Sequence, residues 1–166
     1  NPDRFPFPRP MTGRAEPNFS FAGLKTAVRQ AATALAPLTD ETIADLCASF
    51  EAAVVGTVAD RIRRALPLAF PDDATMHPRR LVVAGGVAAN QRLRAALKDL
   101  CDRHGLELTV PPPALCTDNA AMIAWTGAEH LVHGAIDGLD AAVRARWPLD
   151  ETVTPLIGSG RLGAKA

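Results

Sequence analysis

The spacing of apolar residues predicts two helices in the first seventy residues of the chain. Apolar side chains recur every three or four positions from Phe21 to Leu35, with Ser20 placed to cap this helix and Pro37 to end it. Thr39 opens a second helix of about seven turns, whose apolar stripe consists of Ile43, Leu46, Phe50, Val54, Val58, Ile62 and Leu66. The simplest interpretation is two antiparallel helices packed on each other.

After a polar, proline-bearing loop, short apolar runs alternate with helical spacing. The expected elements are, in order, a buried strand at 81–84, a helix that ends at His104 and Gly105, a strand at 106–110 and a helix that begins near Thr117. Alternating strand and helix imply a parallel crossover. Ligands of parallel sheets bind at the carboxyl ends of the strands. We therefore expect the loops 85–90 and 111–119 to lie side by side on one edge.

Composition narrows the class of protein. With 166 residues, of which 48% are hydrophobic and 22% charged, the chain is long enough and apolar enough to fold around a core. Eighteen basic residues balance 18 acidic ones, which argues against a nucleic-acid domain that works by bulk charge. Three scattered cysteines without a CxxC pair suit a reducing compartment. No apolar run approaches the roughly 20 residues of a membrane span, and no signal peptide is recognisable, so we expect a cytoplasmic protein.

The first seventeen residues have a different character from the rest. They contain Pro2, Pro6, Pro8, Pro10 and Pro17, which exclude a helix and disfavour a central strand. The chain also begins without a methionine. We therefore expect the sequence to be a fragment of a longer protein.

The turn at Gly85 and Gly86 is the first candidate site. Glycines after a strand let a ligand approach the backbone, and the following helix offers unpaired N–H groups to an anion. Asn90, at the start of that helix, could bind a ribose, a phosphate or a carbonyl. The alternative is a tight turn in which Asn90 only caps the helix. The pattern is neither GxGxxG nor a P-loop, so both interpretations stay open.

Asp118 is the second candidate, since it lies at the mouth of the last expected helix after three consecutive prolines. Capping is the commonest role of a carboxylate in this position. The functional alternative is a metal ligand whose partners lie elsewhere. His130 and His133 are three residues apart but lack a third ligand, so they predict no metal site by themselves.

Arginines gather in three short stretches, at 61–64, 79–80 and 144–146. Most such clusters are solvated surface. Two Trp, six Phe and no Tyr leave little aromatic surface for stacking of unpaired bases. The sequence leaves open whether these arginines contact the phosphate backbone of a nucleic acid.

Ordered motifs carry a resemblance to a known family. In sequence order they are Asn18-Phe-Ser-Phe-Ala-Gly-Leu-Lys-Thr26, Val83-Ala-Gly-Gly-Val-Ala-Ala-Asn90 followed by Leu93-Arg94, and Cys116-Thr-Asp-Asn-Ala-Ala-Met-Ile-Ala124. The lead-in adds Asn1-Pro-Asp-Arg-Phe and Pro8-Arg-Pro-Met11. From Asn1 to about Pro148 the chain closely resembles the rear half of the tRNA threonylcarbamoyltransferase family.

The resemblance implies a fold and a reaction. The family has the actin, Hsp70 and sugar-kinase fold, with two ribonuclease-H-like lobes. It transfers a threonylcarbamoyl group from threonylcarbamoyl-adenylate to the exocyclic amine of the adenosine just 3′ of the anticodon, in tRNAs that read codons beginning with A. By position, Asn90 would match the substrate-binding asparagine, Asp118 a ligand of one divalent metal ion (usually iron), and Gly85 and Gly86 would line the adenosine side of the cleft. Expected partners are tRNA and, in bacteria, TsaB-like and TsaE-like proteins; no membrane is expected.

The resemblance also implies a layout, and one departure. We expect 1–166 to be one fragment of the C-terminal lobe, with a helical insertion at 18–75, a strand-helix-strand-helix nucleotide-binding unit at 79–135 and a C-terminal segment at 136–166. The family's other metal ligands, a His-x-x-x-His pair, have no counterpart here, and the early strands of the rear lobe with their glycine-rich loops are missing. The chain alone is therefore expected to be inactive.

Two other classes of protein compete with the transferase. The family includes catalytically silent paralogues that act as dimerisation scaffolds, although a scaffold need not keep Asn90 and Asp118. A small-molecule kinase or carbamoyltransferase of the same superfamily would share the glycine turn but lack the other two motifs.

Overall fold

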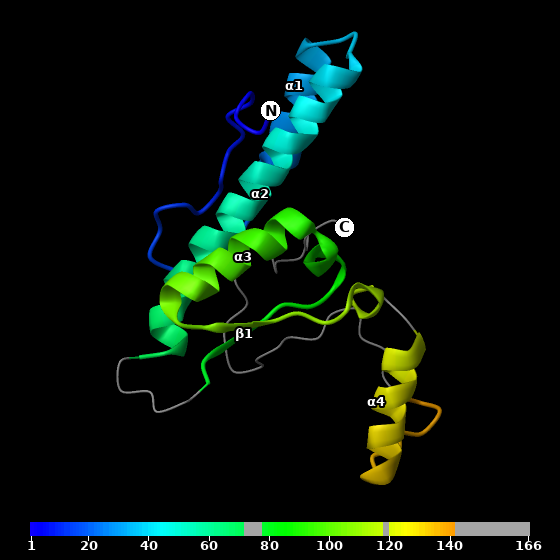
Figure 1. The fold of residues 1–166 in the computed structure, drawn as a ribbon. Coiled ribbons are helices and arrows are strands. Elements are labelled where there is room, and N and C mark those ends of the chain that lie inside the picture. Colours follow the sequence, from blue (N-terminus) through cyan, green and yellow to red (C-terminus); the bar gives the residue numbers. More distant parts are fainter. Residues whose placement is uncertain (72–77, 118–119, 142–166) are drawn as a thin grey trace. The chain divides into compact units, whose positions relative to one another are not determined.

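The computed structural model describes residues 1–71, 78–117 and 120–141. The described part is a helix-rich α/β protein with four α-helices and two parallel strands. It divides into two compact units, Asn1–Asn119 and Ala120–Ala166. The elements, in chain order (Figure 1), are α1 (Leu24–Ala34), α2 (Asp40–Ala69), β1 (Arg80–Val82), the 3₁₀-helix η1 (Gly86–Ala89), α3 (Gln91–His104), β2 (Glu107–Thr109), the 3₁₀-helix η2 (Pro113–Leu115) and α4 (Ala120–Val132).

Helix α1 begins later than the apolar spacing predicts. Gly23 precedes it with a left-handed backbone (φ 80°), and no side chain caps the helix. The hydroxyl of Ser20 instead accepts a hydrogen bond from the backbone N–H of Ala22 at 3.2 Å. This local turn competes with capping. The prediction that Ser20 caps the helix is therefore wrong, and Phe21 lies outside the helix.

Helix α2 begins where the sequence places it. Thr39 Oγ1 accepts a hydrogen bond from the backbone N–H of Thr42 at 3.2 Å, and Asp40 and Glu41 occupy the first turn, where negative charge is favourable. The helix continues for 30 residues. It runs in the opposite direction to α1 and packs against it (Figure 1), as predicted for a helical pair.

The buried face of α2 differs from the predicted apolar stripe. Of that stripe only Leu46 is fully buried, while Ile43 and Phe50 are 44% and 41% exposed. The face that is buried carries mostly small and polar side chains, namely Thr42, Asp45, Leu46, Ser49, Ala53, Thr57, Asp60 and Arg61. The apolar spacing that marks this helix therefore does not mark its buried face.

The proline-rich lead-in runs beside α2 (Figure 1) and contacts the first half of its polar face. Arg4 donates to the Asp45 carboxylate at 2.8 Å. The backbone N–H of Phe5 donates to Ser49 Oγ at 3.2 Å. The hydrogen bond from Arg4 holds the pKa of the Asp45 carboxyl below its usual value. As predicted, the lead-in forms neither helix nor strand, but it supplies the partners that let polar side chains be buried.

A second set of contacts holds the far end of the lead-in. Arg61 is fully buried, pairs with Asp60 and donates to the backbone carbonyl of Glu16 at 2.7 Å. The mostly exposed Arg63 binds the other oxygen of Asp60 at 2.6 Å. The hydrogen bond from Arg61 holds the pKa of the Asp60 carboxyl below its usual value. The lead-in is thus tied to α2 at both ends.

The strand-helix-strand segment forms the parallel crossover that the sequence predicts. In β1 and β2, Arg80 pairs with Glu107 and Val82 with Thr109. Asn90 opens α3, and Gly105 closes it in a left-handed conformation (φ 65°), as expected from the sequence. The two strands are one or two residues shorter than predicted.

The core of the first unit lies between α2, α3 and the two strands. Leu100, Cys101 and Leu106 form its buried centre, and partly buried residues pack around them: Ala59, Ile62, Leu66, Phe70, Leu81 and Leu108. Burial raises the pKa of the Cys101 thiol, which disfavours a reactive thiolate.

Val82 is 65% exposed, so the predicted burial of the whole first strand is wrong. With two strands and α3 on one side, the sheet buries alternate side chains only.

In the second unit the structure describes one helix, α4, and the chain that follows it to residue 141. Every described residue of α4 is exposed, including Met122, Ile123, Trp125, Leu131 and Val132. The predicted 79–135 unit therefore crosses the boundary between the two compact units.

Helix α2 also tests the expectation that no segment is long and apolar enough to span a membrane. Among the described residues it is the one helix long and apolar enough to cross a membrane by length and composition, which corrects the expectation that no segment qualifies. Core helices of soluble proteins pass the same test. In α2 the charged residues Asp45, Asp60 and Arg61 are buried and paired within the fold.

Candidate functional site

The glycine turn leaves the carboxyl end of β1 and leads directly into η1. Gly85 has φ 87°, a backbone conformation that residues other than glycine rarely adopt. Gly86 has no such restriction, and a Cβ placed on either glycine would meet no described atom within 4 Å. The backbone of the turn is thus open to whatever approaches it.

Asn90 connects this turn to two helices. Its Oδ1 accepts a hydrogen bond from the backbone N–H of Leu93 at 2.8 Å, which caps α3. Its Nδ2 donates to Glu51 Oε1 of α2 at 2.7 Å. Asn90 therefore caps α3, and its contact with a ligand stays a prediction. One amide N–H and one oxygen lone pair are not used by these two bonds.

Arg94 joins the two loops that the sequence places on one edge. Its guanidinium donates to the carbonyl of Ala88 in η1 and, at 3.4 Å, to the carbonyl of Pro111 after β2. It also lies 3.6 Å from the buried Sγ of Cys116. The prediction that these loops lie side by side is thus confirmed for their described residues. The sequence predicts no role for Arg94, because its partners are backbone carbonyls, which every residue carries and no residue type reveals.

A cavity of about 410 Å³ opens beside Asn90, between α2 and the start of α3. It is largely apolar, with one carboxylate and one amide, and is lined by Phe50, Glu51, Val54, Val55, Val87, Asn90 and Leu93. Small-molecule sites commonly combine an apolar wall with a few polar groups that fix orientation. The sequence singles out neither Phe50 nor Glu51 as a site residue, because Phe50 is one member of the apolar stripe of a helix and Glu51 one acidic residue among many.

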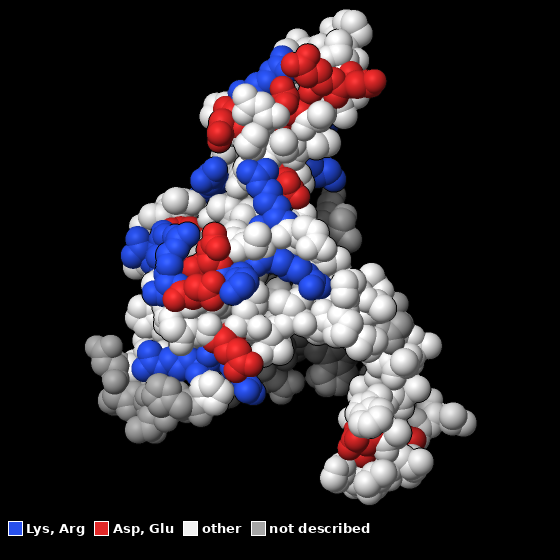
Figure 2. Space-filling model, in the orientation of Figure 1, with Lys and Arg blue, Asp and Glu red and all other residues white. Residues whose placement is uncertain are grey.

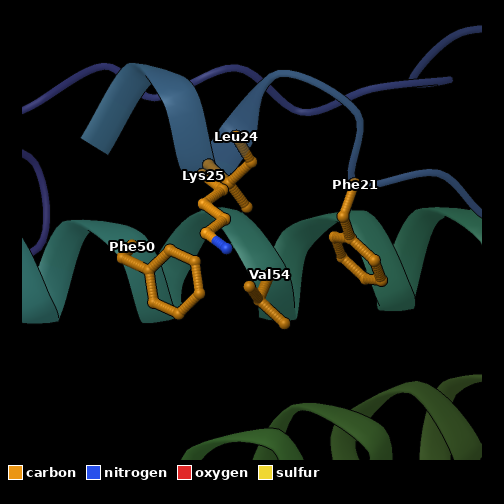
Figure 3. Close-up of a pocket in the computed structure, with 5 residues that line it drawn as sticks. All are labelled: Phe21, Leu24, Lys25, Phe50 and Val54. Carbon is orange, nitrogen blue, oxygen red and sulfur yellow. The ribbon is translucent and has the colours of Figure 1, made fainter. Parts of the chain in front are cut away.

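A neighbouring pocket of about 270 Å³ shares Phe50 and Val54 with this cavity. It is completed by Phe21, Leu24 and Lys25 from the segment around the start of α1 (Figure 3). Figure 3 shows the Lys25 side chain extending toward Phe50 and Val54. The part of the apolar stripe around Phe50 and Val54 is therefore open and bordered by hollows.

The metal prediction falls mostly outside the described residues, because Asp118 itself is not among them. Within the described ranges no group of three or more His, Cys, Asp or Glu side chains could hold a metal ion. His130 and His133, which the sequence did not favour as ligands, are exposed. The described residues thus offer no ligand set against which an iron site could be tested.

The described basic clusters are interleaved with acidic residues. Arg63 pairs with Asp60, and Arg80 Nε lies 2.8 Å from Glu107. Figure 2 shows the two signs mixed on the face it presents rather than one basic field. The cluster at 144–146 lies outside the described residues.

The fold and the site together define a helix-rich α/β protein that carries a glycine turn and a capping asparagine at the rim of an open cavity. The model of the family "tRNA N6-adenosine threonylcarbamoyltransferase" (TsaD) matches residues 1–125. The chain belongs to this family.

Curated proteins of the same name are similar along the whole chain. The protein from Brucella anthropi is 60% identical over 169 residues, which cover 100% of this chain and 46% of that protein. The protein from Rhizobium meliloti is 60% identical over 167 residues, with the same coverage. The protein from Brucella suis is 60% identical over 166 residues, 98% of this chain and 45% of that protein. The chain thus spans a little less than half the length of these relatives.

Proposed function

We propose that the full-length protein carrying this chain transfers a threonylcarbamoyl group from threonylcarbamoyl-adenylate to the exocyclic amine of the adenosine just 3′ of the tRNA anticodon. The amine replaces the adenylate at the carbamoyl carbon, AMP leaves, and the amine loses a proton. Family membership over residues 1–125 supports the transfer reaction and tRNA as substrate. The same proposal includes an actin- and Hsp70-like lobe, with a helical insertion at 18–75, a nucleotide-binding unit at 79–135 and a C-terminal segment at 136–166. It also includes a cytoplasmic location and TsaB-like and TsaE-like partner proteins.

The observation that carries the proposal is the position of Asn90. It lies at the rim of an apolar cavity of about 410 Å³, next to a glycine turn whose backbone is unobstructed. An adenosine presents a flat apolar ring and polar edges, which suits an apolar wall with one amide and one carboxylate. Gly85 and Gly86 would let the adenylate approach the backbone, and the start of η1 would offer N–H groups.

The proposed metal ion belongs to Asp118 and to ligands outside this chain. When bound, such an ion would supply charge stabilisation to the carbonyl or phosphate oxygens of the donor. Within the described ranges, no group of three or more His, Cys, Asp or Glu side chains could hold the ion by itself.

A transfer assay on the full-length protein, with unmodified tRNA and threonylcarbamoyl-adenylate, tests the proposal. We expect modified tRNA and AMP in equal amounts, and a loss of activity of about tenfold or more in Asn90→Ala, the scale expected for a lost substrate hydrogen bond. A full-length protein that folds and dimerises but transfers nothing, with or without its partner proteins, would instead identify the scaffold paralogue.

A further inference from the structure

The hydrogen bond between Asn90 and Glu51 joins residues 39 positions apart in the sequence. Glu51 Oε1 accepts from Asn90 Nδ2 at 2.7 Å, and both side chains line the same cavity. The second oxygen, Oε2, lies 3.5 Å from a guanidinium nitrogen of Arg92. The Glu51 side chain is partly exposed, so its place at the cavity wall is not explained by a need to fill a core.

An asparagine amide has nearly the same shape in its two flipped orientations but opposite chemistry at its two ends. In the observed orientation, Oδ1 faces the N–H of Leu93 and Nδ2 faces the Glu51 carboxylate. A flip would place oxygen against carboxylate and N–H against N–H, so both contacts would become repulsive. Two contacts of opposite polarity therefore select one orientation.

We propose that Glu51 is a positioning residue for substrate binding, which holds the Asn90 amide so that one N–H and one oxygen lone pair are presented to the ligand in the cavity. This inference rests on the proposed function, because it assumes that Asn90 contacts the adenylate. Glu51 acts through Asn90. A carboxamide at position 51 keeps an oxygen acceptor, whereas alanine removes it.

The test is the affinity of the full-length protein for AMP, the product of the proposed reaction, measured by calorimetry. We expect Asn90→Ala and Glu51→Ala each to weaken binding by about tenfold, within the range of one hydrogen bond, and Glu51→Gln to stay within about twofold of wild type. The double variant Glu51→Ala/Asn90→Ala should bind no more weakly than Asn90→Ala alone, because coupled residues are not additive.

Arg92→Ala is the matched control, since Arg92 contacts Glu51 but not Asn90, and it should leave the affinity for AMP within about twofold of wild type. Unchanged affinity in Glu51→Ala, or a further loss in the double variant, would overturn the positioning role. Unchanged affinity in Asn90→Ala would instead overturn the proposed adenylate site, so the two failures are distinguishable.

If Glu51→Ala does not fold, the exchanged pair Glu51→Gln/Asn90→Asp provides the second test. In this double variant the carboxamide at position 51 can donate to the carboxylate at position 90. That carboxylate still accepts from the backbone N–H of Leu93, so both contacts persist. The cavity would then receive no amide N–H from position 90. We expect a loss as large as that of Asn90→Ala; wild-type affinity in a folded exchanged pair would overturn the proposal.

Discussion

The two faces of α2 differ in side-chain composition and in exposure to solvent. The covered face carries Asp45, Ser49, Asp60 and Arg61 and is buried beneath the proline-rich lead-in. The open face carries Phe50 and Val54 and borders two hollows. Polar side chains of the covered face can be buried because backbone and arginine groups of the lead-in bind them. Phe50 and Val54 lie on the side of α2 that faces the two hollows.

The largest effect is expected at Arg61, at the far end of the covered face. Arg61→Ala removes a fully buried guanidinium and leaves the Asp60 carboxylate and the Glu16 carbonyl without it. We expect a loss of about 3–5 kcal/mol in the free energy of unfolding, the usual result of breaking a buried pair. Denaturant unfolding of the full-length protein measures this loss.

The control for this change is Arg63→Ala, which removes a mostly exposed arginine from the same Asp60. We expect a cost below about 1 kcal/mol. Equal costs for the two variants would show that the lead-in does not make the covered face different from solvent-exposed surface.

The next largest effect compares two residues of the predicted stripe. Leu46 is 5% exposed and Ile43 is 44% exposed, although both belong to the same helical pattern. Leu46→Ala should cost about 2–5 kcal/mol of unfolding free energy, as core truncations do, and Ile43→Ala less than about 1 kcal/mol. The same unfolding measurement tests both. A larger cost at Ile43 would restore the stripe as the packed face.

Local features of this chain follow from its sequence. Thr39, Asn90 and Gly105 mark helix ends correctly, because a cap is decided by neighbouring residues along the chain. The parallel pairing and the meeting of the two loops follow from general rules of crossover connections. These features need no knowledge of distant partners.

Features that depend on distant partners were missed, and one local cap was misassigned. Ser20 has the right side chain for a cap but uses it in its own turn. The burial of Asp60 and Arg61 depends on the lead-in, some 45 residues earlier in the chain. Glu51 is one acidic residue among many until the fold brings Asn90 within 2.7 Å. The site was predicted at Gly85, Gly86 and Asn90, but its opposite wall on α2 was not.

A milder effect should appear when the covered face is titrated. Arginine hydrogen bonds hold the pKa values of the Asp45 and Asp60 carboxyls below their usual range. A carboxyl whose pKa is lower in the folded state stabilises the fold above its unfolded pKa of about 3.9, and this contribution is lost as the pH falls through the lower folded value. The lead-in should therefore stay docked from neutral pH to about pH 5 and loosen below about pH 4.

Amide hydrogen exchange of residues 1–17, corrected for the intrinsic effect of pH, measures this loosening. Asp60→Asn should reduce the pH dependence, since an amide does not titrate in this range. Protection that is unchanged between about pH 5 and about pH 3 would mean that the arginine contacts do not hold the lead-in.

The smallest effect on stability is expected at Gly86, which contrasts with Gly56 and Gly85. At Gly56 on α2 a Cβ would lie 2.9 Å from an Arg9 nitrogen of the lead-in, so the chain itself occupies that space. At Gly86 a Cβ would meet no described atom within 4 Å, and the backbone has no positive φ.

Gly86→Ala should therefore change the free energy of unfolding by no more than about 0.5 kcal/mol. The same variant should weaken AMP binding, measured by calorimetry. Gly85→Ala, at φ 87° and ψ 175°, should cost about 1–3 kcal/mol through backbone strain alone. If Gly86→Ala leaves both stability and AMP affinity unchanged, the adenylate does not bind at the open side of the turn, and Gly86 is not needed for binding.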